Sequence, residues 1–235
     1  MSTAHFDSRD CHAAVVPVAP PLAHHAGIIA IAAGALFGCA QLLAFATMDR
    51  SDLAGTLSAA PYRVAAVTLL VAFAAVAIAA VALYERQAAQ AGKLGAAGVC
   101  AALVGTFFLG GDYWFETFAV PWYAVVLPEM LRIPGAGWLA VGGTTSYVLF
   151  STGWVLFAIS SMRVNGIPRL PCVALILGGV VGVFAALPPY GVILGLALVW
   201  VGLGVPRSAA HQRQQPLDGR GQEAHATGSP ATHRH

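Results

Sequence analysis

The stretch VAAVTLLVAFAAVAIAAVALY, residues 64–84, is almost entirely apolar and carries no charge. A helix needs about 20 such residues to cross about 30 Å of hydrocarbon, so this stretch predicts a transmembrane helix. Similar stretches occur on both sides of it. We expect five more spans, at about 26–46, 94–111, 137–162, 170–187 and 189–205. The sequence therefore predicts an all-α, polytopic membrane protein with a bundle of six transmembrane helices over residues 26–205.

The composition supports a membrane environment. Of the 235 residues, 58% are hydrophobic and 9% are charged, whereas an ordinary soluble domain carries about 25% charged residues. The formal net charge of +2 is small and dispersed, which argues against a nucleic-acid partner. The lipid bilayer is the expected surrounding, and the oligomeric state is left open.

The last two predicted spans are short. Pro188, Pro189 and the neighbouring Tyr190 and Gly191 are the only turn signals between them. Two full crossings are favoured, and a re-entrant hairpin that does not cross the bilayer is the alternative.

Loop charges predict the orientation. Arg86 and Lys93 lie in one loop, Arg163 and Arg169 in another, and the tail adds four arginines, whereas the opposite loops mix arginines with carboxylates. Because Lys and Arg concentrate in cytoplasmic loops, both termini are expected in the cytoplasm of a multi-pass plasma-membrane protein. Residues 1–25 would form a cytoplasmic segment without the pattern of a cleaved secretory signal. Residues 206–235 would form a disordered tail, because they contain hardly any large apolar residues.

The cysteines and histidines do not predict a metal or cofactor site. None of the four cysteines forms a CxxC pair, so a disulfide framework or structural zinc site is not expected. His24 and His25 precede the first span, where interfacial residues are favoured over haem ligands. We predict no cofactor.

Small and hydroxyl-bearing residues predict close helix packing. Gly34 and Gly38 form a GxxxG motif in the first span, and Gly178 and Gly182 form another in the fifth. The fourth span carries a central group of hydroxyls, which favours hydrogen bonds within or between helices over a polar translocation path. No ionisable residue lies deep within the six spans, which argues against a proton pump or voltage sensor.

The segment GGDYWFETFAVPWYAVVLPEMLRIPGAGW, residues 110–138, combines aromatic and acidic side chains. Asp112 and Glu116 are four apart and would share one face of a helix. Such a pair could act as an acid or bind a cation. We take Asp112 and Glu116 as candidate catalytic residues, and the wider ligand-binding set is Asp112, Trp114, Glu116, Trp122 and Glu129.

The expected depth of this segment in the bilayer favours a simpler interpretation. If the third helix begins at Lys93, Asp112 lies about 28 Å along it, at 1.5 Å per residue, which is the outer boundary of the bilayer. An external interfacial segment with an aromatic belt then suffices. It would include a short amphipathic helix between Pro121 and Pro128 and a surface pair of Glu129 and Arg132.

The stretch GDYWFETFAVPW, residues 111–122, resembles a segment of uncharacterised multi-pass membrane proteins of actinobacterial type. The resemblance covers about a dozen residues and implies no activity.

Three functions remain open. The first is a membrane protein that binds a small molecule, lipid or partner at its outer face. The second is a small transporter or channel. The third is a membrane-embedded enzyme with a carboxylic acid, comparable in size and span number to membrane terpene cyclases, whose motifs do not match here. The absence of GxxxxGK[ST] and HExxH argues against nucleotide-driven and zinc-protease chemistry.

Overall fold

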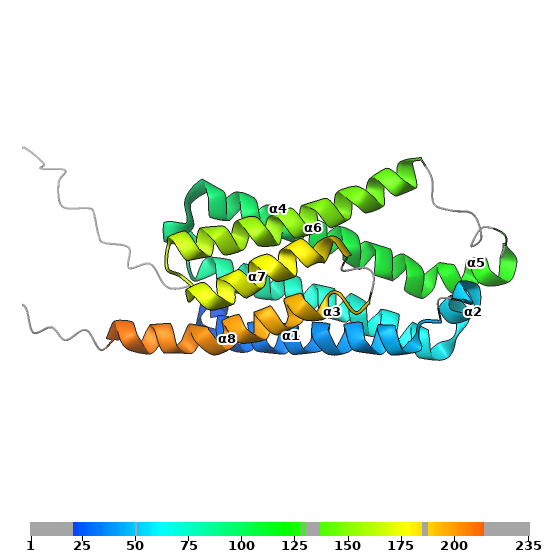
Figure 1. Ribbon diagram of the computed structural model, residues 1–235, viewed down its shortest axis with the longest axis horizontal. Helices are drawn as coiled ribbons and strands as arrows, with labels where there is room; N and C mark the ends of the chain where they lie inside the picture. Colours follow the sequence, from blue (N-terminus) through cyan, green and yellow to red (C-terminus); the bar gives the residue numbers. More distant parts are fainter. Residues whose placement is uncertain (1–20, 50, 128, 130–136, 185–187, 214–235) are drawn as a thin grey trace, which may run out of the picture.

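The computed structural model describes residues 21–49, 51–127, 129, 137–184 and 188–213, and all regular structure in these ranges is helical (Figure 1). The elements in chain order are α1 (Pro21–Thr47), α2 (Leu53–Ser58), α3 (Ala60–Glu85), α4 (Ala88–Phe118), α5 (Val120–Val126), α6 (Trp138–Arg163), α7 (Arg169–Val181), the 3₁₀ helix η2 (Gly182–Phe184) and α8 (Val192–Arg213). The all-α prediction is confirmed for this part of the chain.

Four helical segments are long and apolar enough to cross a membrane. They are Leu22–Thr47, Ala60–Glu85, Ala88–Val126 and Ala140–Arg163. Two shorter apolar helices, Arg169–Phe184 and Val192–Val205, follow them. A helix therefore lies at each of the six predicted positions, and four of the six are long and apolar enough for a full span within the described residues.

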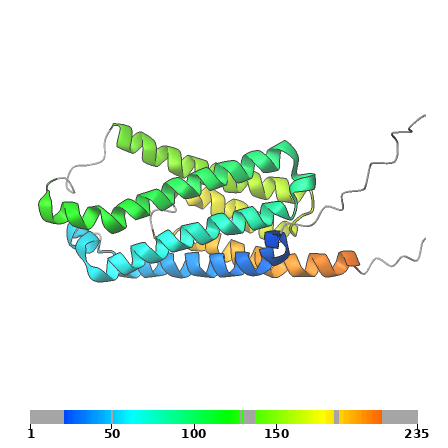
Figure 2. The same cartoon turned by 180° about the vertical axis from the view of Figure 1, so that it is seen from behind.

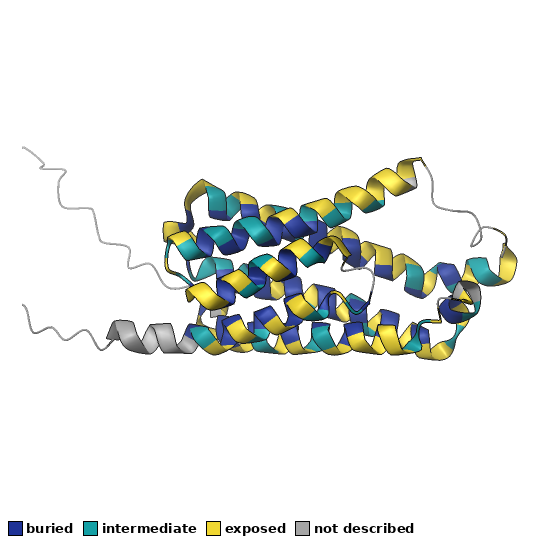
Figure 3. Cartoon of the chain, viewed as in Figure 1, coloured by how far each residue is buried: buried dark blue, intermediate teal, exposed yellow. Residues whose placement is uncertain are grey.

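The six longest helices, α1, α3, α4, α6, α7 and α8, contact one another in a ring. α1 packs between α3 and α8, α4 packs between α3 and α6, and α7 packs between α6 and α8. Neighbours in the chain are therefore neighbours in space, and the contact of α8 with α1 closes the ring. Figure 3 shows the buried faces directed toward the ring interior.

Aromatic side chains fill the ring interior. Phe37, Phe73, Phe150, Trp154 and Phe157 are almost completely buried. Successive ring centroids, from Phe37 to Phe73 and on to Phe157, are 5.1 to 6.4 Å apart with steep interplanar angles. Edge-to-face contacts of this kind are favourable for aromatic pairs. The interior is thus packed with side chains along much of its length.

Glycines allow the closest helix contacts. A Cβ added at Gly34 would collide with the backbone carbonyl oxygen of Gly195, so α1 and α8 touch through their backbones. On the other side of the ring, a Cβ at Gly105 would collide with the backbone nitrogen of Phe150. These contacts confirm that small residues mediate helix packing. In the GxxxG motif of the first span Gly34 makes the close contact, whereas a Cβ at Gly38 would meet no atom within 4 Å.

α4 is longer than its predicted span of 94–111. The helix begins at Ala88, contains one non-helical residue, Gly92, with φ of 58° and ψ of −161°, and continues to Phe118. α5 follows almost directly, with Pro121 in its first turn, a position that proline tolerates because the N–H there has no helical partner. The segment 110–138, predicted to be external, therefore begins as helix. Its residues 128 and 130–136, including Arg132, lie outside the described residues.

The apolar helices of the α7–α8 hairpin are shorter than the four spanning segments. At 1.5 Å per residue, Arg169–Phe184 spans about 24 Å and the apolar part of α8, Val192–Val205, about 21 Å, less than the 30 Å of a bilayer core, although α8 itself continues to Arg213. Its turn packs against α1, because a Cβ at Gly191 would meet the Gln41 side chain at 2.6 Å. Figures 1 and 2 show α4, α5 and the start of α6 extending beyond this turn. We call this extended part the α5 end.

Candidate functional site

A cavity of about 560 Å³ lies at the α5 end, between α4 and α6. Its lining comes from α2, α4, α5 and α6 and combines two carboxylates with aromatic, aliphatic and glycine residues: Leu57, Phe108, Leu109, Asp112, Phe115, Glu116, Val120, Trp138, Ala140, Gly142, Gly143, Ser146 and Tyr147. Helices separated in the sequence therefore converge on one hollow.

The two carboxylates lie one turn apart on the same face of α4, as their spacing predicts. Glu116 is half-buried, and its Oε2 accepts a hydrogen bond of 2.9 Å from the Tyr62 hydroxyl. Asp112 is exposed to the cavity opening. Within the described residues, the Asp112 carboxylate has no hydrogen-bonding or ion-pair partner. The site thus contains one fixed carboxylate and one available carboxylate.

Tyr62 holds Glu116 from a neighbouring helix. α3 begins after the extended residue Ala59, with Pro61 in its first turn, so the orientation of Tyr62 is set by the start of the helix. The tyrosine is 3% exposed and packs in a small cluster with Leu57, Ala66 and Val120. This cluster joins α2, α3 and α5 and supports the wall of the cavity.

The ring interior beside the cavity is filled with large side chains. Leu109 lines the cavity and is buried, and Phe150 lies one helical turn from the lining residue Tyr147. Phe73 contacts Phe150 at 6.1 Å and stacks on Tyr113 at 5.4 Å between ring centroids. The cavity is therefore bounded by packed aromatic residues on the side facing the rest of the ring.

The hydroxyls of α6 bond mainly within their own helix. Thr145 donates to the Val141 carbonyl oxygen at 2.7 Å, and Ser146 donates to that of Gly142 at 2.9 Å. Thr144 and Thr152 are exposed, while Ser151 is buried. These observations support the structural interpretation of the hydroxyls over a continuous polar path.

The other predicted ligand-binding residues do not line this cavity. Trp114 lies on another face of α4, in a hollow of about 310 Å³ formed with α3. Trp122 lies on α5, where its ring meets that of Tyr123 edge-to-face at 5.1 Å. Glu129 is exposed beyond α5. Of the five predicted residues, the structure brings Asp112 and Glu116 together in this cavity.

Sequence reasoning missed Tyr62 and Tyr147. Tyr62 is 54 positions from Glu116, and its contact depends on how α3 packs against α4. Tyr147 and Trp138 reach the cavity from α6. The one signal available for Tyr62 was a tyrosine, next to Arg63, at the beginning of a mainly apolar helix.

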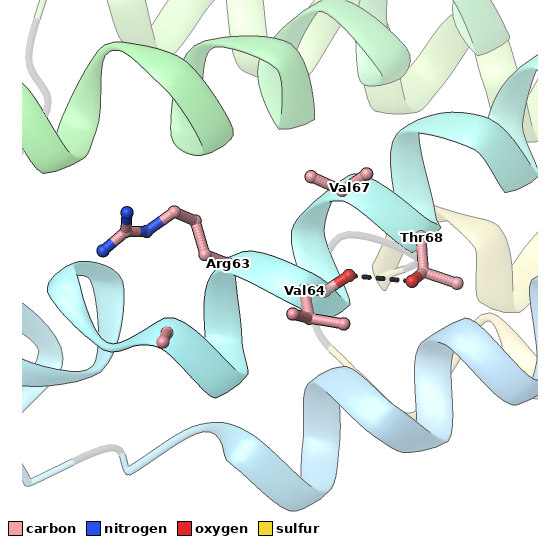
Figure 4. Close-up of a pocket in the computed structure, with 5 residues that line it drawn as sticks. Arg63, Val64, Val67 and Thr68 are labelled. Atoms are coloured by element: carbon pink, nitrogen blue, oxygen red, sulfur yellow. Dashed lines mark hydrogen bonds between the residues drawn. The ribbon is translucent and has the colours of Figure 1, made fainter.

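A third hollow, of about 360 Å³, follows the outer surface of α3 (Figure 4). Arg63, Val64, Val67 and Thr68 line it, and Thr68 donates a 2.7 Å hydrogen bond to the Val64 carbonyl oxygen. The Arg63 guanidinium donates to the Ser58 carbonyl oxygen at 2.9 Å. All its lining residues belong to α3, so this hollow lacks the convergence of helices found at the first cavity.

No protein-family model, curated protein or solved structure matches this chain. The resemblance of residues 111–122 to actinobacterial-type membrane proteins stays a prediction.

Proposed function

We propose that this chain is an integral plasma-membrane protein that binds a small molecule or lipid in the cavity between α4 and α6. Six helices would span or enter the bilayer, and both termini would lie in the cytoplasm. Four helices of spanning length support the membrane location.

The positions of the loops support the proposed orientation. The start of α1, the end of α8 and the turns after α3 and α6 lie at one end of the ring (Figure 1). This end carries Arg86, Lys93 and Arg163 near the helix termini, as the positive-inside rule requires of a cytoplasmic face. The cavity would then open at the outer face.

The single observation that carries the binding function is the composition of the cavity. Its volume of about 560 Å³ falls in the range of about 300–1,000 Å³ typical of small-molecule sites. Its lining is mainly apolar, with a few convergent polar groups from Asp112, Glu116 and Ser146. Because Phe73 and Phe150 fill the adjacent ring interior, binding at one end explains the geometry better than passage through the ring.

Native mass spectrometry of the detergent-purified protein tests this function. We expect a specific co-purifying molecule on the wild-type protein. Gly143→Trp should remove it, because Gly143 lines the cavity and a Cβ there meets no atom within 4 Å, so the indole can occupy the cavity.

Gly111→Trp is the matched control. Gly111 also has open space at its Cβ position but lines the hollow beside Trp114, so its substitution should leave the bound molecule in place. Equal retention by Gly143→Trp and the wild-type protein would contradict the proposal.

A further inference from the structure

We propose that the ligand of the α4–α6 cavity is an organic cation with an apolar body, an inference that rests on the proposed binding function. Three features of the cavity support this class of ligand: the charge of its lining, its aromatic side chains and its volume.

The charge of the cavity has one sign. Asp112 and Glu116 are its two ionisable acids, and its described lining contains no Lys, Arg or His. Tyr62 supplies a neutral donor to Glu116, and no described cation pairs with either carboxylate. Coulomb attraction is stronger near low-dielectric surroundings than in water. A bound cation would therefore be favoured there, and an anion would be repelled.

Three aromatic side chains line the cavity together with the carboxylates. Phe115 comes from α4, and Tyr147 and the exposed Trp138 come from α6. The faces of such rings attract cations, tryptophan most strongly, and organic ammonium groups are commonly bound in this way. Carboxylates alone would suit many ligands, whereas carboxylates with aromatic rings favour an organic cation.

The size and remaining lining argue against a bare metal ion. A calcium ion requires six to eight oxygen ligands within about 2.6 Å, and the described residues contain no group of three His, Cys, Asp or Glu side chains suited to a metal. The cavity of about 560 Å³ also has aliphatic walls from Leu57, Leu109 and Val120. These walls would contact the apolar body of the ligand.

Binding of two probes that share a triphenylphosphorus body tests the charge requirement. Tetraphenylphosphonium is the cation, and triphenylphosphine oxide is the neutral compound. Each is titrated by calorimetry into the full-length protein in phosphatidylcholine nanodiscs, with empty nanodiscs subtracted. We expect saturable binding of the cation at least tenfold tighter than that of the neutral compound.

Substitutions then locate the binding. Asp112→Asn and Glu116→Gln should each weaken binding of the cation at least tenfold, while Asp112→Glu should retain it. Glu129→Gln is the control, because Glu129 is exposed outside the cavity. A thermal unfolding curve for each variant identifies any loss of fold, and the exposed position of Asp112 makes its amide variant the more informative one.

Three results would overturn the inference. Equal binding of both probes, insensitive to Asp112→Asn but lost in Gly143→Trp, would retain the binding cavity and reject the cationic class. Displacement of the cation by micromolar calcium would indicate a metal site instead. Failure of Gly143→Trp to change the binding of either probe would reject both the inference and the proposed function.

Discussion

At the residue scale, the contact between Tyr62 and Glu116 ties the cavity to the rest of the helix ring. The 2.9 Å hydrogen bond joins α3 to α4, and the tyrosine ring is buried among residues of α2 and α5. A carboxylate fixed in this way cannot turn freely toward solvent. Asp112, one turn earlier, is the more accessible acid of the pair.

We expect Tyr62→Phe to lower the free energy of unfolding by about 1 kcal/mol, because it removes a hydrogen bond to a carboxylate and little apolar area. Denaturant titration of the detergent-solubilised protein measures the change. In a Glu116→Ala background the same substitution should have much less effect, since the partner is already absent.

Tyr123→Phe is the control for this cycle. Tyr123 contacts the rings of Phe115 and Trp122, and no described residue bonds to its hydroxyl. An equal effect of Tyr62→Phe in both backgrounds would show that the hydrogen bond to Glu116 contributes nothing.

At the element scale, the α4–α6 contact positions the cavity wall. Gly105 on α4 and Gly153 on α6 meet the backbone of the opposite helix, near Phe150 and Ala102 respectively. These contacts bring the two helices together on the side of the cavity away from the α5 end. At the start of α6, in contrast, a Cβ added at Gly142 or Gly143 would meet no atom within 4 Å. The helices are therefore tightly packed at one level and leave room for a ligand at another.

Gly105→Ala should destabilise the protein by about 1–3 kcal/mol, because overpacking forces backbone shifts. The matched variant is Gly111→Ala on the same helix, where the added Cβ has open space. It should be neutral or slightly stabilising, since alanine favours helix over glycine by up to about 1 kcal/mol. Equilibrium unfolding in mixed micelles compares the two, and equal stabilities would show that the α4–α6 contact is looser than the structure indicates.

At the scale of the whole molecule, the position of the turn between α7 and α8 makes the two ends of the ring unequal. All six long elements are present where the hairpin packs, and α1, α3, α4 and α6 continue toward the α5 end (Figure 2). The hairpin turn lies at the level of Gln41, before α1 ends at Thr47. Between this turn and the α5 end, the ring lacks α7 and α8. The cavity lies at that same end.

The proposed orientation predicts opposite labelling of two engineered cysteines. The native cysteines are first replaced by alanine, including Cys39, Cys100 and Cys172, which are free in the structure. In intact cells, a membrane-impermeant maleimide should label Ser51→Cys, in the exposed turn before α2, but label Asn165→Cys only after permeabilisation. The reverse pattern would invert the topology and place the cavity on the cytoplasmic side.

The sequence alone determined the helical class, the positions of the six apolar helices and the shared face of Asp112 and Glu116. These properties depend on local composition and on the period of a helix, which act within a few turns. The segment 110–138 was less well predicted, because an aromatic and acidic sequence suits a helix end and an interfacial loop equally.

Tertiary structure decided which residues meet. The pairing of Tyr62 with Glu116, the separation of Trp114 and Trp122 from the carboxylates, and the arrival of Tyr147 at the cavity all depend on helix rotation and packing order. Apolar residues cover nearly the whole circumference of these helices, so the sequence pattern does not indicate which face points inward. Close contacts between a glycine and the backbone of the neighbouring helix, as at Gly34 and Gly105, depend on that rotation. They form only when the two helices lie side by side.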